Sequence, residues 1–161
     1  MNEDERLTWK EMWILTATLV GKRSKCARAQ YGAVIVSEDN RVLAVGYNGA
    51  PAGKATQGKC TSWCERAINA ADGKDVDPSY LDCHAVHAEI NAILRANSLW
   101  LEKSPTLYVN GVTCMRCALT IANSGIKSVV MCVTEFEEKR NPTATKQLLE
   151  SYGVAVEMVY L

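Results

Sequence analysis

The chain has 161 residues, the length of one ordinary domain, and we expect a single domain over 1–161. Apolar residues make up 48% of the sequence and charged residues 22%, a balance that excludes an intrinsically disordered chain. Lys plus Arg and Asp plus Glu both number 18, so no overall positive charge exists to attract a phosphate backbone or an anionic membrane surface, and we expect no long nucleic acid and no membrane as partner.

The N-terminal part of the chain predicts a cytoplasmic protein that begins with a helix. The first six residues, MNEDER, are acidic where a secretory signal is basic, and the apolar stretch over 12–20 is too short to span a bilayer. Apolar side chains at helical spacing over 8–21 predict a helix that ends at Gly21. The β-branched runs over 31–37 and 41–47 then predict two strands joined by a hairpin.

A polar segment over about 48–82 follows the two strands. It is rich in Gly, Pro, Lys, Asp and Cys, with one possible short helix over 64–71. A loop of this length usually has a function or is held in place by a cross-link or a bound metal, so we treat it as a Cys-containing insertion in the domain.

Helices and strands alternate in the rest of the chain. The patterns predict helix and strand three times in succession, over 85–98 and 106–109, then 114–125 and 127–133, then 143–153 and 154–160. Strands that alternate with helices are joined by crossovers, which make this part of the sheet largely parallel and cover it with helices. The order predicts a three-layer α/β/α domain.

The chain contains seven cysteines, which in a reducing compartment are metal ligands or buried thiols more often than disulfides. Cys114 and Cys117 form a tight pair, whereas Cys132 stands among apolar neighbours and is expected in the core. The remaining four are dispersed over Cys26, Cys60, Cys64 and Cys83.

Two short motifs carry the candidate chemistry. HAE at 87–89 and CMRC at 114–117 each open a predicted helix, where the positive field of the helix end favours the thiolate that binds metal. Spacing of three residues puts both sulfurs on one helical face. His87, Cys114 and Cys117 are three ligands, the number typical of a catalytic zinc whose fourth position holds water. Glu89 is placed to act as the proton shuttle.

These motifs resemble a known signature, H-x-E followed by P-C-x-x-C, of zinc-dependent nucleobase deaminases. The segments HAEINAI, TLYV, TCMRCALTIANSGIKSVV and GYNGAPAG are similar to the dCMP deaminase family, from about Arg23 to Gly153. The resemblance implies a cytidine-deaminase-like fold with a central mixed five-stranded sheet, and hydrolysis of dCMP to dUMP and ammonia. It also implies zinc on His87, Cys114 and Cys117, with Glu89 as acid and base.

The chain departs from the family pattern directly before the cysteine pair. Thr113 stands where the family has Pro, although Thr also serves as a helix N-cap. In the family this loop lies against the base, so Val112 and Thr113 are expected substrate contacts. The departure leaves open whether the base is cytosine or a 5-substituted cytosine.

Further substrate contacts follow from the resemblance. Asn48 is expected to bond the sugar or phosphate, Val34 to contact the base through its backbone, and Phe136 to lie over the pocket. Independently of the family, the segment after the first helix offers a local anion site with four candidates, Arg23, Ser24, Lys25 and Arg28. Solvated surface charge explains them equally well.

The family resemblance also suggests regulation and assembly. GYNG, with Gly46, Tyr47, Asn48 and Gly49, lines a family site for deoxynucleoside triphosphates, so activation by dCTP with Mg²⁺ and inhibition by dTTP are expected; a simple turn is the alternative. Relatives carry a second, structural zinc, for which the candidates are Cys26, Cys60, Cys64 and Cys83, with His84 as a possible replacement. Relatives are usually homohexamers.

Two other functions remain open at this point. A tRNA adenosine deaminase shares the HAE and Cys-x-x-Cys motifs, but it should be basic, whereas this chain has no net charge. A non-catalytic, zinc-stabilised nucleotide-sensing module is the second, and the presence of Glu89 argues against it. The four dispersed cysteines also have an alternative without a metal, in which their thiols only pack against neighbouring residues.

Overall fold

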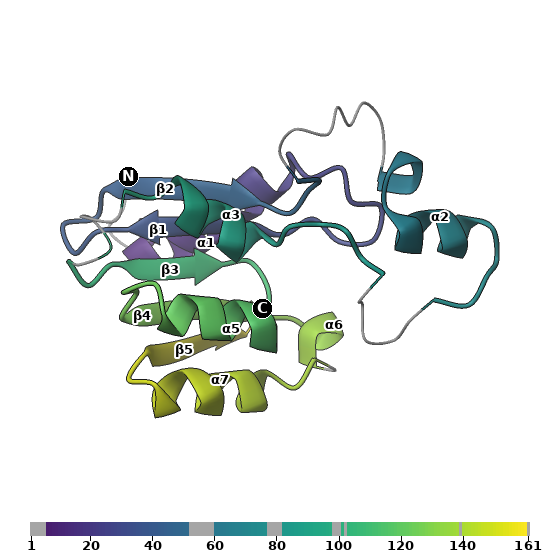
Figure 1. The fold of residues 1–161 in the computed structure, drawn as a ribbon. Helices are drawn as coiled ribbons and strands as arrows, with labels where there is room; N and C mark the ends of the chain where they lie inside the picture. Colours follow the sequence, from purple (N-terminus) through teal and green to yellow (C-terminus); the bar gives the residue numbers. More distant parts are fainter. Residues whose placement is uncertain are drawn as a thin grey trace.

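A five-stranded mixed sheet forms the centre of the computed structural model, which describes residues 6–51, 60–76, 82–97, 101, 103–138 and 140–160 (Figure 1). The strands lie in the order β2-β1-β3-β4-β5. β1 is antiparallel to both of its neighbours, whereas β3, β4 and β5 run parallel. Their bounds are Gly32–Val36, Val42–Tyr47, Thr106–Val109, Ser128–Val133 and Ala155–Tyr160, for β1 to β5 in turn.

Helices cover both faces of this sheet (Figure 1). One face carries α1, and the other carries α3, α5 and α7, with bounds Trp9–Gly21, Ala88–Arg95, Met115–Ala122 and Pro142–Ser151 in turn. None of the helices in the described part of the chain has the length and apolar character that a membrane crossing requires. The predicted three-layer α/β/α architecture with a mixed five-stranded sheet is confirmed.

The residues of β1 show why the sheet must be covered twice. All five of them are buried. Successive side chains of a strand point to opposite faces of the sheet, so burial of every residue requires that both faces be covered. Ala33 and Ile35 belong to the main core under α3, α5 and α7, whereas Val34 packs against Trp13 and Ala17 of α1. An apolar run without alternation is therefore a central strand between two layers of helices.

The insertion contributes a helix that stands away from the sheet. A 3₁₀ turn, η2 (Cys60–Ser62), leads into α2 (Glu65–Ala71), close to the short helix predicted over 64–71. Figure 1 shows α2 beyond the end of the sheet, on the side where α3 and α5 begin. Residues 52–59 and 77–81 of the insertion lie outside the described residues.

Three differences from the predicted helices have a clear physical reason. The helix predicted over 85–98 is confined to α3, because the residues before it continue as extended backbone. α7 begins at Pro142, one residue before the prediction, since Pro suits the first turn of a helix and Asn141 caps it. A short helix after β4, α6 (Glu135–Glu138), was not predicted, because its acidic sequence has no apolar period.

Candidate metal centre and catalytic pocket

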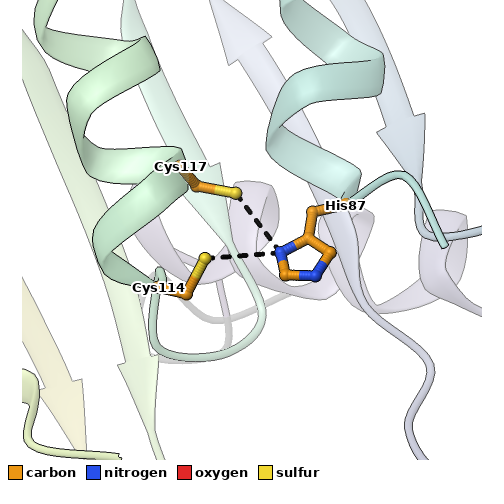
Figure 2. A group of neighbouring side chains, drawn as sticks. All are labelled: His87, Cys114 and Cys117. Atoms are coloured by element: carbon orange, nitrogen blue, oxygen red, sulfur yellow. Dashed lines mark hydrogen bonds between the residues drawn. The ribbon is translucent and has the colours of Figure 1, made fainter. Parts of the chain in front are cut away.

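Two helix starts bring three metal-binding side chains together beyond the carboxyl end of β3. His87 is the N-cap residue of α3 and Cys114 that of α5, while Cys117 lies in the first turn of α5. The side chain of His87 forms no capping hydrogen bond with α3, so its imidazole is available for a ligand. Figure 2 shows the imidazole of His87 and the two sulfurs pointing toward one another from these two helices.

The three ligand atoms fit a zinc ion. His87 Nδ1 lies 3.4 Å from Cys114 Sγ and 3.3 Å from Cys117 Sγ, and all three atoms lie within 4.8 Å of one another. Bonds of about 2.3 Å to sulfur and about 2.0 Å to nitrogen at tetrahedral angles separate sulfur and nitrogen by about 3.5 Å. Three such ligands leave one coordination position for water, as in catalytic zinc sites.

The start of α3 is fixed to the end of β2 by backbone bonds. The N–H of Gly49 donates to the carbonyl of Val86 at 3.0 Å, and the N–H of Val86 donates back at 2.8 Å. Asn91 Nδ2 donates to the carbonyl of Tyr47 at 2.8 Å. Because Val86 directly precedes His87, these bonds determine where the imidazole lies.

The cluster shares protons in a way that favours metal binding. A hydrogen bond from Cys117 lowers the pKa of Cys114 to about 3, and the same bond raises the pKa of Cys117, as burial also does. The bond to Cys114 raises the pKa of His87 against the effect of burial. One sulfur is therefore a thiolate at neutral pH, the form that coordinates zinc.

Glu89 is a buried carboxylate in the first turn of α3, with 4% of its surface exposed. Burial raises its pKa, and the charge of His87 opposes that shift. The residue before Cys114 also presents a polar atom, since Thr113 Oγ1 is buried and forms no hydrogen bond of standard geometry among the described residues, although the side chain faces Glu89 and lowers the pKa of its carboxyl. A buried, unsatisfied hydroxyl in a native structure points to a ligand or a water.

A cavity of about 460 Å³ opens beside these groups. His87, Glu89, Val112 and Cys114 line one part of it, so the candidate metal ligands and the carboxylate face a common space. Its volume is within the range of small-molecule sites. The four cysteines of the second candidate cluster line the same cavity.

The structure places the predicted substrate contacts unevenly around this cavity. Asn48 and Val112 line it. The side chain of Asn48, however, accepts from the N–H of Tyr31 at 2.9 Å and donates to the carbonyl of Ala29 at 3.0 Å. Its observed role is to hold the segment before β1. The side chain of Phe136 lies outside the described part of the structure.

Three other predicted contacts lie away from the cavity. Ser24 is buried, and its hydroxyl accepts from the N–H of Cys26 at 3.1 Å. Lys25 lines a different, smaller pocket. Val34 is in the central strand, with its side chain under α1 and its backbone paired with β2 and β3. The structure does not bring these three residues together with Glu89, because the sheet separates Val34 from α3.

The four dispersed cysteines gather between the insertion and the segment before β1. Cys60 and Cys64 are buried and pack with Trp63, Cys26 and Cys83. Burial raises the pKa of Cys60 and of Cys83, and neighbouring thiols add to the shift. Among the described residues, however, only the His87 group brings three ligand atoms all within 4.8 Å.

His84 is not placed among these cysteines. Its Nε2 atom lies 3.7 Å from Glu65 Oε2, and half of its side chain is exposed. Sequence adjacency to Cys83 does not bring its imidazole to the four sulfurs, because consecutive side chains in an extended segment diverge.

GYNG is explained in part by packing. A Cβ at Gly46 would lie 2.2 Å from the carbonyl oxygen of Ala88, so the close approach of α3 to β2 requires glycine. Tyr47 and Gly49 line a second pocket of about 220 Å³ together with Trp63, Arg23, Lys25, Ala50, Asn91 and Arg95. Trp63 Nε1 is buried and has no partner among the described residues.

Sequence analysis missed a network at the edge of the main cavity. Tyr31 donates a short hydrogen bond to Glu137, and Arg140 Nη1 donates to the Tyr31 hydroxyl at 2.7 Å. Tyr31 and Arg140 line the cavity. Burial, together with the bond to Glu137, raises the pKa of Tyr31. The acidic run that contains Glu137 has the composition of a solvent-exposed helix face, so no local sequence pattern predicts that Glu137 is buried.

A three-ligand metal centre beside a buried carboxylate is the arrangement of zinc-dependent hydrolases with an open coordination position. Residues 7–133 match the family model described as the cytidine and deoxycytidylate deaminase zinc-binding region. The chain therefore belongs to the cytidine and deoxycytidylate deaminase family.

Individual relatives agree with this family. The chain is 33% identical to deoxycytidylate deaminase of Homo sapiens over 94% of its length and 79% of the relative. It is 42% identical to deoxycytidylate deaminase of Mycobacterium phage D29 over 78% of its length and 94% of the relative. It also superposes on the crystal structure of dCMP deaminase from the cyanophage S-TIM5 in complex with dCMP and dUMP, with a TM-score of 0.67, 28% identity and 99% of each chain covered.

Proposed function

We propose that this chain hydrolyses dCMP to dUMP and ammonia. The observation that carries the proposal is the grouping of His87, Cys114 and Cys117 beside a cavity that His87, Cys114 and the buried carboxylate of Glu89 line together. Two kinds of relatives support the proposal: the similar proteins of Homo sapiens and Mycobacterium phage D29 are named deoxycytidylate deaminases, and the similar cyanophage structure is a complex with dCMP and dUMP.

In this proposal His87, Cys114 and Cys117 hold one Zn²⁺, whose Lewis acidity lowers the pKa of water enough to supply a nucleophile at neutral pH. Glu89 moves the protons. Burial raises the pKa of its carboxyl, which makes the carboxylate a better proton acceptor than an exposed one and moves its pKa toward the neutral range that suits a general acid and base. It takes one proton from the attacking water and passes it to the ring nitrogen. It then takes the proton of the hydroxyl now bonded to the attacked ring carbon and gives it to the amino group, which leaves as ammonia as the carbonyl forms.

The loop before Cys114 is proposed to recognise the base. Val112 lines the cavity, and the buried hydroxyl of Thr113 offers a polar contact to a substrate. Because a site built around a specific hydrogen bond discriminates strongly against ligands that cannot form it, Thr113→Val tests this role through the KM for dCMP.

The decisive experiment measures ammonia release from dCMP by the purified, zinc-loaded protein. Glu89→Gln is expected to lower kcat by at least about 10²–10⁴, the contribution of a general acid–base group, while keeping zinc. Glu38→Gln, at the exposed β1–β2 turn, removes the same charge and should change nothing. Ammonia release from adenosine in a tRNA stem-loop with none from dCMP, or full turnover by Glu89→Gln, contradicts the proposal.

We infer that the second pocket binds a triphosphate effector. Its support is the gathering of Arg23, Lys25 and Arg95 around Tyr47 and Gly49 of GYNG, because guanidinium and ammonium groups favour phosphate oxygens. The proposed response is activation by dCTP with Mg²⁺ and inhibition by dTTP. Arg95→Gln should abolish both responses and leave the activity without effectors intact; unchanged responses in this variant contradict the site.

A second, structural Zn²⁺ on Cys26, Cys60, Cys64 and Cys83 is also proposed. Four ligands close a zinc coordination shell, and the four thiols already share one buried cluster. Their sulfurs must approach one another further to bind one ion. Two zinc ions per chain, by elemental analysis, support this site, and one argues against it.

The proposed quaternary state rests on the family resemblance, and the proposed cellular location rests on the acidic N-terminal sequence. We propose one deaminase domain over 1–161 that assembles as a homohexamer in the cytoplasm. Exposed apolar side chains on α1 and α5, among them Leu15, Leu19 and Leu119, are consistent with surfaces that an assembly covers. Sedimentation of the zinc-loaded protein tests the assembly, and a monomer at all concentrations contradicts it.

A further inference from the structure

Glu137 is a buried carboxylate for which the proposed reaction has no use. Only 3% of its surface is exposed, although it lies in the four-residue helix α6. Its Oε2 atom accepts from the backbone N–H of Val112 at 2.9 Å, and its Oε1 atom accepts from the hydroxyl of Tyr31. A buried carboxylate persists only when it is paired and hydrogen-bonded, so this group has a defined structural purpose.

Arg140 completes the network of Glu137. Its Nη1 atom donates to the Tyr31 hydroxyl at 2.7 Å and lies 3.4 Å from Glu137 Oε2. Its guanidinium also lies 5.2 Å from the centre of the Tyr31 ring, within the range of a cation–π contact. These contacts restrict a long, flexible side chain to one position at the cavity wall, about a third of it exposed.

The same network fixes the loop that leads to Cys114. A Cβ at Gly111 would lie 2.4 Å from Cε1 of Tyr31, so the aromatic ring packs directly on this backbone. The next residue, Val112, donates its N–H to Glu137. The position of Arg140 and the position of the loop before the metal centre are therefore set by the same two side chains, Tyr31 and Glu137.

The cavity has three cationic side chains among its described lining residues: Arg28, Arg66 and Arg140. Arg66 forms an ion pair with Asp82 at 3.0 Å in which both side chains are mostly buried, so its charge is neutralised within the protein. Of the four residues of the predicted anion site, Arg28 lines this cavity, whereas Arg23 and Lys25 line the second pocket. Arg140 differs from Arg28 in being tied to the loop that borders the metal centre.

Arginine suits an oxyanion at this place. Its guanidinium carries five N–H donors in a fixed fork, so it can hold Tyr31 and Glu137 and still contact phosphate oxygens. We propose that Arg140 contacts the phosphate of the nucleotide substrate, and that Tyr31 and Glu137 are positioning residues that hold its guanidinium at the cavity. This inference rests on the proposed dCMP deaminase function and assigns the residue that distinguishes a nucleotide from a nucleoside.

The test compares dCMP with deoxycytidine, which lacks the phosphate. Arg140→Gln is expected to lower kcat/KM for dCMP at least tenfold, mainly through KM, and to leave deoxycytidine unaffected; where deoxycytidine turns over too slowly, its Ki as a competitor of dCMP replaces kcat/KM. Arg140→Lys should retain part of the preference for dCMP, since it keeps the charge and loses the fork. Arg41→Gln, which removes the same charge at the β1–β2 turn, is the matched control.

Tyr31→Phe tests the positioning role. It removes the hydroxyl that joins Glu137 to Arg140 and keeps the ring against Gly111, so the preference for dCMP over deoxycytidine should fall in the same direction as in Arg140→Gln. Zinc content and the thermal midpoint of each variant are measured alongside.

Three outcomes overturn the inference. Arg140→Gln without any effect on the preference does so, as does an equal loss for both substrates, which indicates a structural role. A loss of preference in Arg28→Gln instead of Arg140→Gln assigns the phosphate to the other arginine. Failure of the proposed function is distinct, because the unmodified protein then releases no ammonia from dCMP.

Discussion

The two groups of cysteines in this chain are held in place by different kinds of structure. Cys114 and Cys117 lie in the start of α5, which packs on the sheet, and they face His87 at the start of α3. Cys60 and Cys64 lie in the insertion, whose helix α2 stands beyond the sheet, and they meet Cys26 and Cys83 from loops. The first group has its ligand atoms at zinc-binding separations, and the second does not.

This difference indicates that the two groups of cysteines have different functions. A catalytic centre must be positioned within a fraction of an ångström, which rigid elements achieve better than loops. A structural metal can instead supply the order itself, because binding free energy becomes folding free energy when the ligands come from flexible segments. We therefore expect the first group to control turnover and the second to control stability.

The largest expected effect comes from removing one sulfur from each group. Cys117→Ala should lower kcat/KM for dCMP more than about 100-fold, since loss of a mere hydrogen-bond partner of a metal ligand already costs about 10–100-fold. Cys64→Ala should keep most of the activity and lower the thermal midpoint by more than about 5 °C, because each kcal/mol moves Tm by about 2–4 °C at this size. Each variant should lose one zinc per chain.

Cys132→Ala is the matched control for this pair, because Cys132 is buried against α1, on the other face of the sheet from α3 and α5, and belongs to neither group. It should change neither zinc content nor kcat. Equal activity losses in Cys117→Ala and Cys64→Ala would remove the distinction between the two groups.

A smaller effect is expected from disturbing the rigid support of the first group. Gly46→Ala places a methyl group 2.2 Å from the carbonyl oxygen of Ala88 and must push α3 away from β2, which costs about 1–3 kcal/mol and displaces His87. Gly49→Ala meets only ordinary contacts, the nearest at 3.8 Å to Tyr47, and serves as control. Denaturant unfolding and zinc affinity should both worsen in Gly46→Ala alone; similar values for the two variants argue against this support.

The smallest effect is a difference in thiol reactivity with pH, measured on metal-stripped protein by alkylation and mass spectrometry. The pKa of Cys114 is lowered to about 3, so its thiolate is fully formed at pH 6 and its alkylation rate should be flat from pH 6 to 9. Burial raises the pKa of Cys60 and Cys83, so their rates should still be rising at pH 9. Parallel pH profiles for all three would contradict this part of the comparison.

Much of the fold and the centre of the candidate site were predictable from sequence. Helical and strand periods gave the three layers, and the HAE and CMRC motifs identified the residues that the structure brings together at two helix starts. These features depend on interactions within one or two turns of the chain, such as the N-cap position and the three-residue spacing of Cys114 and Cys117.

The surroundings of the centre could not be predicted in the same way. The sequence favoured Arg23, Ser24, Lys25 and Arg28 together for an anion, whereas the structure divides them, with Arg28 at the main cavity and Arg23 and Lys25 at another pocket. His84 was grouped with Cys83 because they are adjacent, but its side chain turns to Glu65. Composition and adjacency do not specify which face or cavity a side chain reaches.

Local spacing along the chain was enough to predict a layered α/β domain with a His-Cys-Cys centre and a carboxylate two residues from the histidine. The contact of Tyr31 with Glu137 and Arg140, more than 100 residues away along the chain, is known from the folded structure alone. This contact depends on how the crossovers place β1 beside the segment after β4, and no local pattern encodes that placement.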